Sequence, residues 1–226
     1  MRGPRLAVQL WLDYVAGAWW AFSSPLILRP PSRWSGGSGS PVLLLPGVYE
    51  PWPFLLTLGN RLNAAGHPVH VVREIRNNVG EIPQVAAIAQ RYLDEHALQN
   101  VAIVAHSKGG LVAKHMMAID DAEHRIDRLV AVATPFGGSR MAKFMAVRSL
   151  RAFRPANRTI ALLTANRALN ARITSIYGEF DAHIPGGCRL EGAVNIQLPI
   201  VGHFRLLADD RVIQAVMDAV DREQAV

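Results

Sequence analysis

The chain alternates between short apolar runs and longer segments that carry apolar residues at helical spacing. The apolar runs are rich in Val, Ile and Leu and are as short as strands that are buried on both faces. They lie at 42–45, 69–73, 100–105, 129–133, 172–177 and 194–198. The helical segments lie at 52–65, 82–96, 108–119 and 206–220. This alternation predicts an α/β fold with a mostly parallel central sheet and helices on both faces.

Residues 1–41 do not follow this alternation. An apolar tract at 6–28 predicts a helix with a single charged residue, Asp13, and residues 30–41 (PPSRWSGGSGSP) have the composition of a flexible linker. A membrane-spanning helix would have to bury Asp13, which is costly, whereas the three tryptophans of the tract are typical of a helix with one wet side. We expect this helix and linker (1–41) ahead of a main domain (42–226). Two interpretations of the helix stay open: it packs on the domain, or it attaches the protein to a membrane.

A second irregular segment, at about 135–170, predicts a small helical cap inserted into the domain. Phe144, Val147, Leu150 and Phe153 mark one helical face, and arginines line another. The basic face is either the solvated outside of a cap that covers a site, or a surface that docks on lipid.

The run at 100–105 ends in an unusual turn. The stretch 101–117 reads VAIVAHSKGGLVAKHMM, so Ser107 lies where a buried strand meets a helix. A tight turn strains the backbone at its apex, and small residues such as Ala105 and Gly109 relieve the crowding. The Ser107 hydroxyl would then stand at the end of the sheet, beside a helix N-terminus that favours developing negative charge. Serine in a Gly-rich turn is also common as a simple turn residue or helix cap.

The sequence AHSKGG resembles the nucleophile elbow, G-x-S-x-G, of the α/β-hydrolase family, and in particular that of small bacterial lipases. LLLPGV (43–48) resembles the strand and oxyanion loop of that family, and ATPFGGS (133–139) resembles its stretch after the next strand. Ala105 replaces the first glycine of the elbow, and Pro46-Gly47 stands where the family often has His-Gly. The resemblance covers most of the chain after Val42 and implies the α/β-hydrolase fold.

The resemblance also implies a catalytic triad in the chain order Ser, Asp, His. YGEFDAHIP and VGHF each follow an expected strand, and they offer Asp181 and His203. Serine is a poor nucleophile at neutral pH, so His203 would take the proton of Ser107. Asp181 would fix the imidazole tautomer and stabilise the imidazolium that forms.

Further groups around the serine follow from the same resemblance. The backbone amides of Val48 and Lys108 would form the oxyanion hole. Trp52, Phe54 and Phe136 are candidates for the walls of an acyl pocket, although aromatic residues that open a helix are as often part of the core.

The other chemistry-bearing residues favour structural roles. His106 adjoins the serine, but neighbours in a strand point to opposite sides, so we expect it to pack under the turn. His183 and Cys188 lie near Asp181 without the spacing of metal ligands, and we expect neither a metal nor a cofactor. Because Cys188 is the only cysteine, no intrachain disulfide can form, which suits a cytoplasmic location. The net charge of +6 suits an anionic partner, yet no nucleic-acid-binding motif accompanies it.

These features predict a serine hydrolase that cleaves carboxylic esters, of the lipase or esterase type, through an acyl-enzyme. The expected substrate is a small-molecule or lipid ester, and peripheral contact with a membrane through the N-terminal segment is a second expectation. An acyltransferase would use the same acyl-enzyme and is an alternative. So is a non-catalytic, membrane-associated binding protein on a hydrolase scaffold, although all three triad candidates are present. The oligomeric state stays open.

Overall fold

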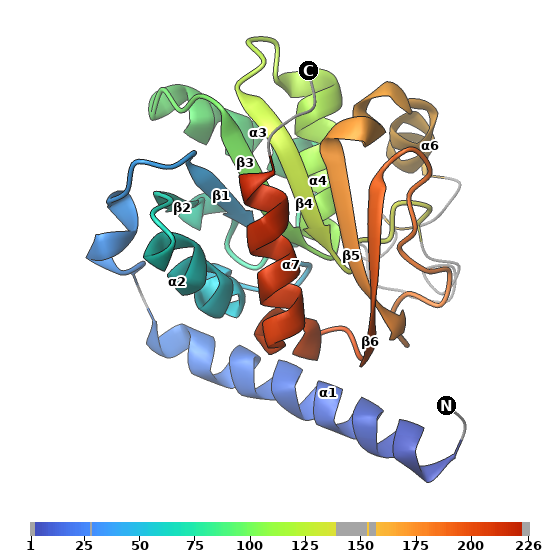
Figure 1. Cartoon of the computed structure of the whole chain (residues 1–226). Helices are drawn as coiled ribbons and strands as arrows, with labels where there is room; N and C mark the ends of the chain where they lie inside the picture. Colours follow the sequence, from blue (N-terminus) through green and yellow to red (C-terminus); the bar gives the residue numbers. More distant parts are fainter. Residues whose placement is uncertain (1–2, 28, 139–152, 154–156, 223–226) are drawn as a thin grey trace.

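The computed structural model describes residues 3–27, 29–138, 153 and 157–222. Within these residues, six strands form one sheet of order β2-β1-β3-β4-β5-β6, and every neighbouring pair is parallel (Figure 1). The strands are β1 (Val42–Leu45), β2 (Val69–Val71), β3 (Val101–His106), β4 (Ile126–Val132), β5 (Ile173–Phe180) and β6 (Val194–Val201). The expected parallel sheet is confirmed, and the carboxyl ends of its strands share one edge.

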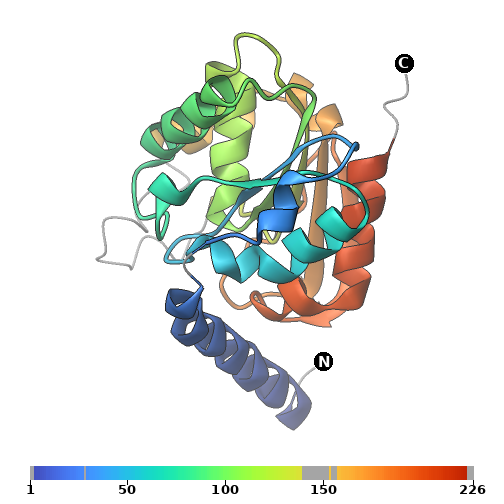
Figure 2. The ribbon, with the colours of Figure 1, turned by 90° about the vertical axis from the view of Figure 1, so that its left-hand side faces the viewer.

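Helices cover both faces of the sheet, as the alternation of apolar segments predicts (Figures 1 and 2). One layer consists of α3 (Ile82–Glu95), α4 (Lys108–His115) and α6 (Arg158–Ala165), and the other of α2 (Leu56–Ala64) and α7 (Asp210–Asp221). Side chains of β1 alternate between the two cores: Leu43 and Leu45 join the first, and Val42 and Leu44 the second. Both faces of the central strands are therefore buried, which explains their unbroken apolar sequences.

Several short helical turns complete the described fold. They are η1 (Ser24–Leu26), η2 (Ser32–Ser35), η3 (Trp52–Leu55), η4 (Arg73–Ile75), the π-helical turn η5 (Met116–Asp120), η7 (Ala168–Arg172) and η8 (Arg205–Ala208). The turn η3 leads into α2, η5 continues α4, and η8 precedes α7. These three junctions lie inside single helical segments of the sequence prediction, because a hydrophobic pattern does not distinguish the kinds of helix.

Strand β4 begins three residues earlier than the apolar run predicts. Asp127 and Arg128, near its start, form an ion pair of 2.5 Å and are only partly buried. The backbone carbonyl of Asp127 accepts a hydrogen bond of 2.8 Å from Arg172 Nε. Charged side chains at the amino end of the strand interrupt the hydrophobic pattern. The pairing with β3 shifts register at the same place, because Val101 pairs with Ile126 and Ala102 with Arg128.

The predicted N-terminal helix is present as α1 (Pro4–Ser23), which lies outside the two helical layers (Figure 1). In the segment expected as a linker (30–41), residues 35–40 are exposed, but one residue is packed on the domain. Trp34, in η2, is 1% exposed, contacts the Trp52 ring at a centroid distance of 5.7 Å and donates a hydrogen bond of 3.1 Å to Asn60 Oδ1. One large aromatic side chain thus ties a Gly- and Ser-rich segment to the core.

Nearly half of the insertion expected at 135–170 lies outside the described residues, including Phe144, Val147 and Leu150 with the arginines at 148, 151 and 154. Phe153 is described and is buried. The helix α6 begins at its asparagine cap, where the Asn157 side chain accepts a hydrogen bond of 2.8 Å from the Thr159 amide.

Candidate active site

Ser107 occupies a strained turn between β3 and α4. Its backbone angles are φ 51° and ψ −118°, a region that non-glycine residues rarely adopt. The chain reaches this turn directly from a fully buried strand and leaves it as the first turn of a helix. The tight strand-to-helix turn expected at Ser107 is therefore present, and it lies at the carboxyl edge of the sheet.

The glycines after the serine leave room for the turn. A Cβ at Gly109 would lie 2.2 Å from the carbonyl oxygen of Leu45, and a Cβ at Gly110 would lie 2.1 Å from Thr134 Oγ1. Thr134 Oγ1 also donates a hydrogen bond of 2.9 Å to the Ser107 carbonyl. The small residue expected at 109 is thus required by the close approach of α4 to β1.

Asp181 and His203 form a hydrogen-bonded pair beside this turn. Asp181 directly follows β5 and His203 follows β6, so neighbouring strands deliver both side chains to the same edge. The His203 Nδ1–H group donates to Asp181 Oδ2 at 2.6 Å. This bond leaves Nε2 as the imidazole nitrogen that can accept a proton.

The surroundings set the charge states of this pair. Burial would raise the pKa of Asp181, but hydrogen bonds from His183 and His203 outweigh it and hold that pKa well below its usual range. Burial lowers the pKa of His203, against the opposing effect of its bond to Asp181. At neutral pH the pair is thus a carboxylate beside a neutral imidazole.

Ser107 and His203 line one cavity of about 350 Å³. Its walls also include the apolar side chains of Val48, Phe54, Phe153, Ile184 and Phe204. Among the described residues no hydrogen bond joins Ser107 to His203, so the structure brings the two side chains to a common cavity without a direct bond. A larger cavity of about 920 Å³, along the edge strand β2, is lined by none of the three triad candidates.

The two candidate oxyanion donors lie next to the serine. Val48 lines the cavity, and the hydrogen bonds described for its loop use the amides of Gly47, Tyr49 and Glu50 rather than that of Val48. Lys108 is the first residue of α4, where backbone amides have no partner within the helix.

The Lys108 side chain has a separate structural role. Its ammonium group is buried and donates to the carbonyl oxygens of Asn78, at 2.7 Å, and Gly80. Burial lowers the pKa of Lys108 to about 8. The side chain thereby ties the loop before α3 to the beginning of α4.

Of the three aromatic residues expected at an acyl pocket, the structure places one on the cavity wall. Phe54 lines the cavity, whereas Trp52 packs on Trp34 in one core. Phe136 is buried in the other core, with the Lys114 ammonium 5.8 Å from its ring centroid. Trp52 and Phe136 therefore belong to the two cores and not to the wall of the cavity.

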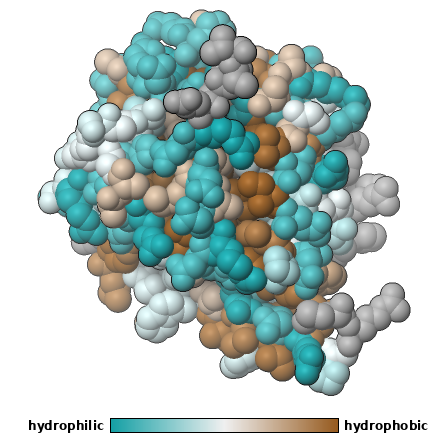
Figure 3. All heavy atoms as spheres, viewed as in Figure 1, coloured by the Kyte–Doolittle hydropathy of each residue, from teal (hydrophilic) through white to brown (hydrophobic). Residues whose placement is uncertain are grey.

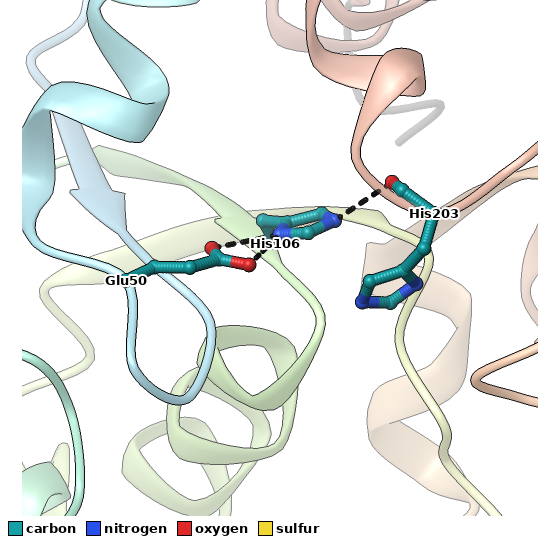
Figure 4. A group of neighbouring side chains, drawn as sticks. All are labelled: Glu50, His106 and His203. Atoms are coloured by element: carbon teal, nitrogen blue, oxygen red, sulfur yellow. Dashed lines mark hydrogen bonds and ion pairs between the residues drawn. The ribbon is translucent and has the colours of Figure 1, made fainter. Parts of the chain in front are cut away.

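A buried Glu50–His106 pair adjoins the candidate triad and was not expected from the sequence (Figure 4). His106 Nδ1 lies 2.8 Å from Glu50 Oε2, and its Nε2 lies 3.2 Å from the backbone carbonyl oxygen of His203. That carbonyl only accepts, so Nε2 carries a proton. Burial would lower the pKa of His106, but the charge of Glu50 and its hydrogen bond outweigh this and raise the pKa.

Glu50 also reaches the loop of the candidate oxyanion hole, because its Oε2 accepts a hydrogen bond of 2.7 Å from the Gly47 amide. The Gly47 loop, Glu50, His106 and the His203 backbone are thereby joined by one chain of hydrogen bonds. His106 is buried as predicted, but it contacts the histidine loop instead of pointing away from the site. The sequence contains one signal that could have pointed to this pair: Glu50 is the only charged residue between 34 and 60.

Among the residues that the structure describes, two groups of side chains have the composition of metal ligands. The ligand atoms of Glu50, His106 and His203 lie within 4.8 Å of one another, and so do those of Asp181, His183 and His203. In the first group both nitrogens of His106 already form hydrogen bonds, and in the second Asp181 is bonded to His203. A metal ion would have to break these bonds, so the geometry favours a proton-transfer site over a metal centre.

Comparisons with known proteins agree with this architecture. Residues 79–176 match the model of a family described as a PGAP1-like alpha/beta domain. The mature form of a Bacillus licheniformis lipase is 12% identical, with a TM-score of 0.63 over 85% of this chain and 94% of the lipase. The chain has the α/β-hydrolase fold.

Other proteins with the α/β-hydrolase fold are similar to the same extent. An enol-lactonase from Burkholderia xenovorans is 13% identical, with a TM-score of 0.59 over 82% of this chain and 93% of that one. The type II thioesterase of the borrelidin biosynthetic cluster is 17% identical, with a TM-score of 0.56 over 85% and 94% of the two chains. No curated protein matches the sequence. At these identities the likeness is one of fold.

Proposed function

We propose that the protein is a serine hydrolase that cleaves carboxylic esters through an acyl-enzyme on Ser107. The observation that carries this proposal is the juxtaposition of two features at one cavity: a serine in a strained strand-to-helix turn, and a histidine hydrogen-bonded to a buried carboxylate. The lipase, lactonase and thioesterase titles of the similar structures support the same reaction class.

In the first half of the proposed reaction, Ser107 Oγ attacks the ester carbonyl carbon while its proton passes to His203 Nε2. The carbonyl oxygen becomes an oxyanion beside the amides of Val48 and Lys108, and one such donor typically contributes about 100- to 1000-fold in rate. When the tetrahedral intermediate collapses, the C–O bond to the alcohol breaks and His203 gives its proton to the leaving oxygen. Asp181 stabilises the imidazolium throughout.

In the second half, water attacks the acyl-enzyme and loses a proton to His203 Nε2. The bond to Ser107 Oγ then breaks, His203 returns the proton to the serine, and the carboxylic acid leaves. An alcohol in place of water would complete an acyl transfer by the same steps. The apolar walls of the cavity, such as Phe54, Phe153 and Phe204, favour an apolar acyl chain.

The test is hydrolysis of p-nitrophenyl esters of increasing acyl length by the full chain, with an alcohol added in parallel reactions. We expect Ser107→Ala to abolish turnover, while Ser35→Ala, at an exposed serine remote from the cavity, leaves it unchanged. Free acid as the main product supports the hydrolase, and the alkyl ester as the main product identifies an acyltransferase. Activity that survives in Ser107→Ala contradicts the proposal.

A further inference from the structure

The helix α1 presents two opposite faces of very different character. Asp13 and Gly17 are buried against the domain, and Trp20 contacts the Phe54 ring at a centroid distance of 5.8 Å. Asp13 Oδ1 accepts hydrogen bonds of 2.8 and 2.9 Å from the amides of Phe204 and Arg205. The packed face thus contains the one acidic residue of the helix, bonded to the loop that follows His203.

The outer face of α1 is apolar and exposed. Its stripe, whose members are three or four positions apart, consists of Val8, Trp11, Leu12, Val15, Trp19 and Phe22. The exposed fraction is 65% for both Trp11 and Trp19 and 77% for Phe22. Figure 3 shows apolar residues gathered over this helix along the lower edge of the molecule. A surface helix of a globular protein normally has the reverse arrangement, with its apolar face inward.

Charge on the N-terminal segment favours an anionic partner. Residues 1–40 contain four arginines, at positions 2, 5, 29 and 33, and one acidic residue, Asp13. Because Asp13 is buried and hydrogen-bonded, the segment offers positive charge to its surroundings without exposed negative charge. A helix with tryptophan and phenylalanine on one side and arginines near its ends is typical of the interface of an anionic bilayer.

The helix that carries the stripe also contributes to the candidate active site. Gly17 and Ala21 of α1 line the cavity that contains Ser107, and the Tyr14 ring lies 5.3 Å from that of His183. The same helix therefore forms one wall of the cavity and carries the apolar stripe on its opposite side. In Figure 1 it lies across the end of the domain where β6 leads into η8.

We propose that α1 docks the protein on an anionic lipid surface through the stripe from Val8 to Phe22, with its axis in the plane of the membrane interface. The helix lies in the interface and does not cross it: none of the described helices has the length and apolarity of a membrane span. The part of the proposal that concerns substrate rests on the proposed function, since docking beside the cavity supplies Ser107 with esters of membrane lipids.

The test measures binding of the full chain to vesicles of phosphatidylcholine and of equimolar phosphatidylcholine and phosphatidylglycerol. We expect binding to the anionic vesicles, weakened by added salt. The triple variant Trp11→Ser, Trp19→Ser, Phe22→Ser should bind at least tenfold more weakly. Substitution of the exposed residues Ile119, Leu162 and Val194 by serine is the matched control and should leave binding unchanged.

The basic residues give a second, independent readout. Arg5→Gln and Arg29→Gln should each weaken binding to the anionic vesicles about fivefold at low salt, because one arginine near such a surface contributes about that factor. Neither change should affect binding to pure phosphatidylcholine. Binding that does not respond to these variants or to salt contradicts the assignment of an anionic lipid as the partner.

Three outcomes overturn the docking proposal: no vesicle binding by the wild type, equal binding by the triple variant, or self-association through the stripe, seen as an oligomer that the triple variant dissociates. Failure of the proposed function is distinguishable. If the protein binds vesicles but its Ser107 is unreactive, the docking proposal holds and the hydrolase proposal is refuted. The triple variant should keep its activity on short water-soluble esters, because none of its residues lines the cavity.

Discussion

The immediate surroundings of Ser107 and His203 suit the proton transfer that we propose between them. The positive φ of Ser107 holds its side chain at the carboxyl edge of the sheet, and the bond from His203 to Asp181 fixes the imidazole tautomer. Burial keeps the imidazole neutral over a wider pH range than in water.

The rate kcat/KM of ester hydrolysis should rise with pH to a plateau, with its midpoint below pH 6.5, the ordinary pKa of histidine. The rate rises with pH because the general base, His203, works only when it is neutral. The midpoint lies below the ordinary value because burial lowers the pKa of His203. A flat profile, or a midpoint above pH 7, contradicts the role of His203.

Asp181→Asn should lower kcat of ester hydrolysis by about 10³- to 10⁴-fold, because the imidazole loses the carboxylate that fixes its tautomer.

The Glu50–His106 pair should position His203 without taking its proton. Glu50→Gln removes the carboxylate that pairs with His106, and displacement of the His203 loop should lower kcat by about 10- to 100-fold with little change in KM. The midpoint of the pH profile should stay in place, because the pair has no net charge before the substitution and none after it. A shifted midpoint would indicate that Glu50 or His106 takes part in proton transfer.

A second carboxylate–histidine pair, remote from the cavity and with an exposed carboxylate, provides a control for this variant. His67 Nε2 lies 3.0 Å from Asp221 Oδ1, with the histidine buried as in the Glu50 pair. Asp221→Asn should change stability in urea denaturation while kcat stays within a factor of about two. Equal losses of kcat in the two variants would show that Glu50 matters only for folding.

At the scale of elements, α1 carries a structural role that is distinct from its outer stripe. Asp13 accepts two hydrogen bonds from the chain just after His203, and a Cβ at Gly202 would lie 2.5 Å from Asp13 Oδ1. The helix, although outside the sheet layers, thus fixes the backbone beside the candidate catalytic histidine.

Asp13→Ala should lower the free energy of unfolding by about 2–4 kcal/mol, because two partly buried amides lose the buried carboxylate that accepts from them. It should also lower kcat. Asp13→Asn keeps an acceptor oxygen and should retain most of both properties. Gln9→Ala, on the same helix, removes only a contact with Arg205 and should change stability by less than about 0.5 kcal/mol in urea denaturation. Equal stability of Asp13→Ala and wild type refutes this role.

The elements themselves were largely predictable, because their physics is local. Unbroken Val, Ile and Leu runs mark strands buried on both faces, and the predicted helix at 82–96 agrees with α3 to one residue. The start of β4 was missed because Asp127 and Arg128 interrupt its pattern. Burial of Trp34 was missed because it depends on Gly59, which is 25 positions away and leaves space for the indole ring.

At the scale of the whole molecule, parallel topology collects distant residues at one edge. The position of Asp181 and His203 at this edge was predictable, because Asp181 directly follows β5 and His203 lies two residues after β6. Their catalytic roles come from the resemblance to α/β-hydrolases and stay a proposal. The Glu50–His106 pair was not predictable, since its members are 56 positions apart, Glu50 lies outside the motifs of that resemblance, and His106 occupies a position of the elbow motif that any residue can fill. Composition marks α1 as apolar, but only the fold shows which of its faces is outward.

The central claim, that Ser107 is activated by His203, is tested most directly by the reaction of the full chain with a fluorophosphonate, followed by peptide mapping of the adduct. We expect one adduct per chain, on Ser107. It should be absent in Ser107→Ala, and labelling should slow by about 10³- to 10⁴-fold in His203→Ala. An adduct on a different residue, or labelling of the wild type no faster than that of His203→Ala, would contradict the account.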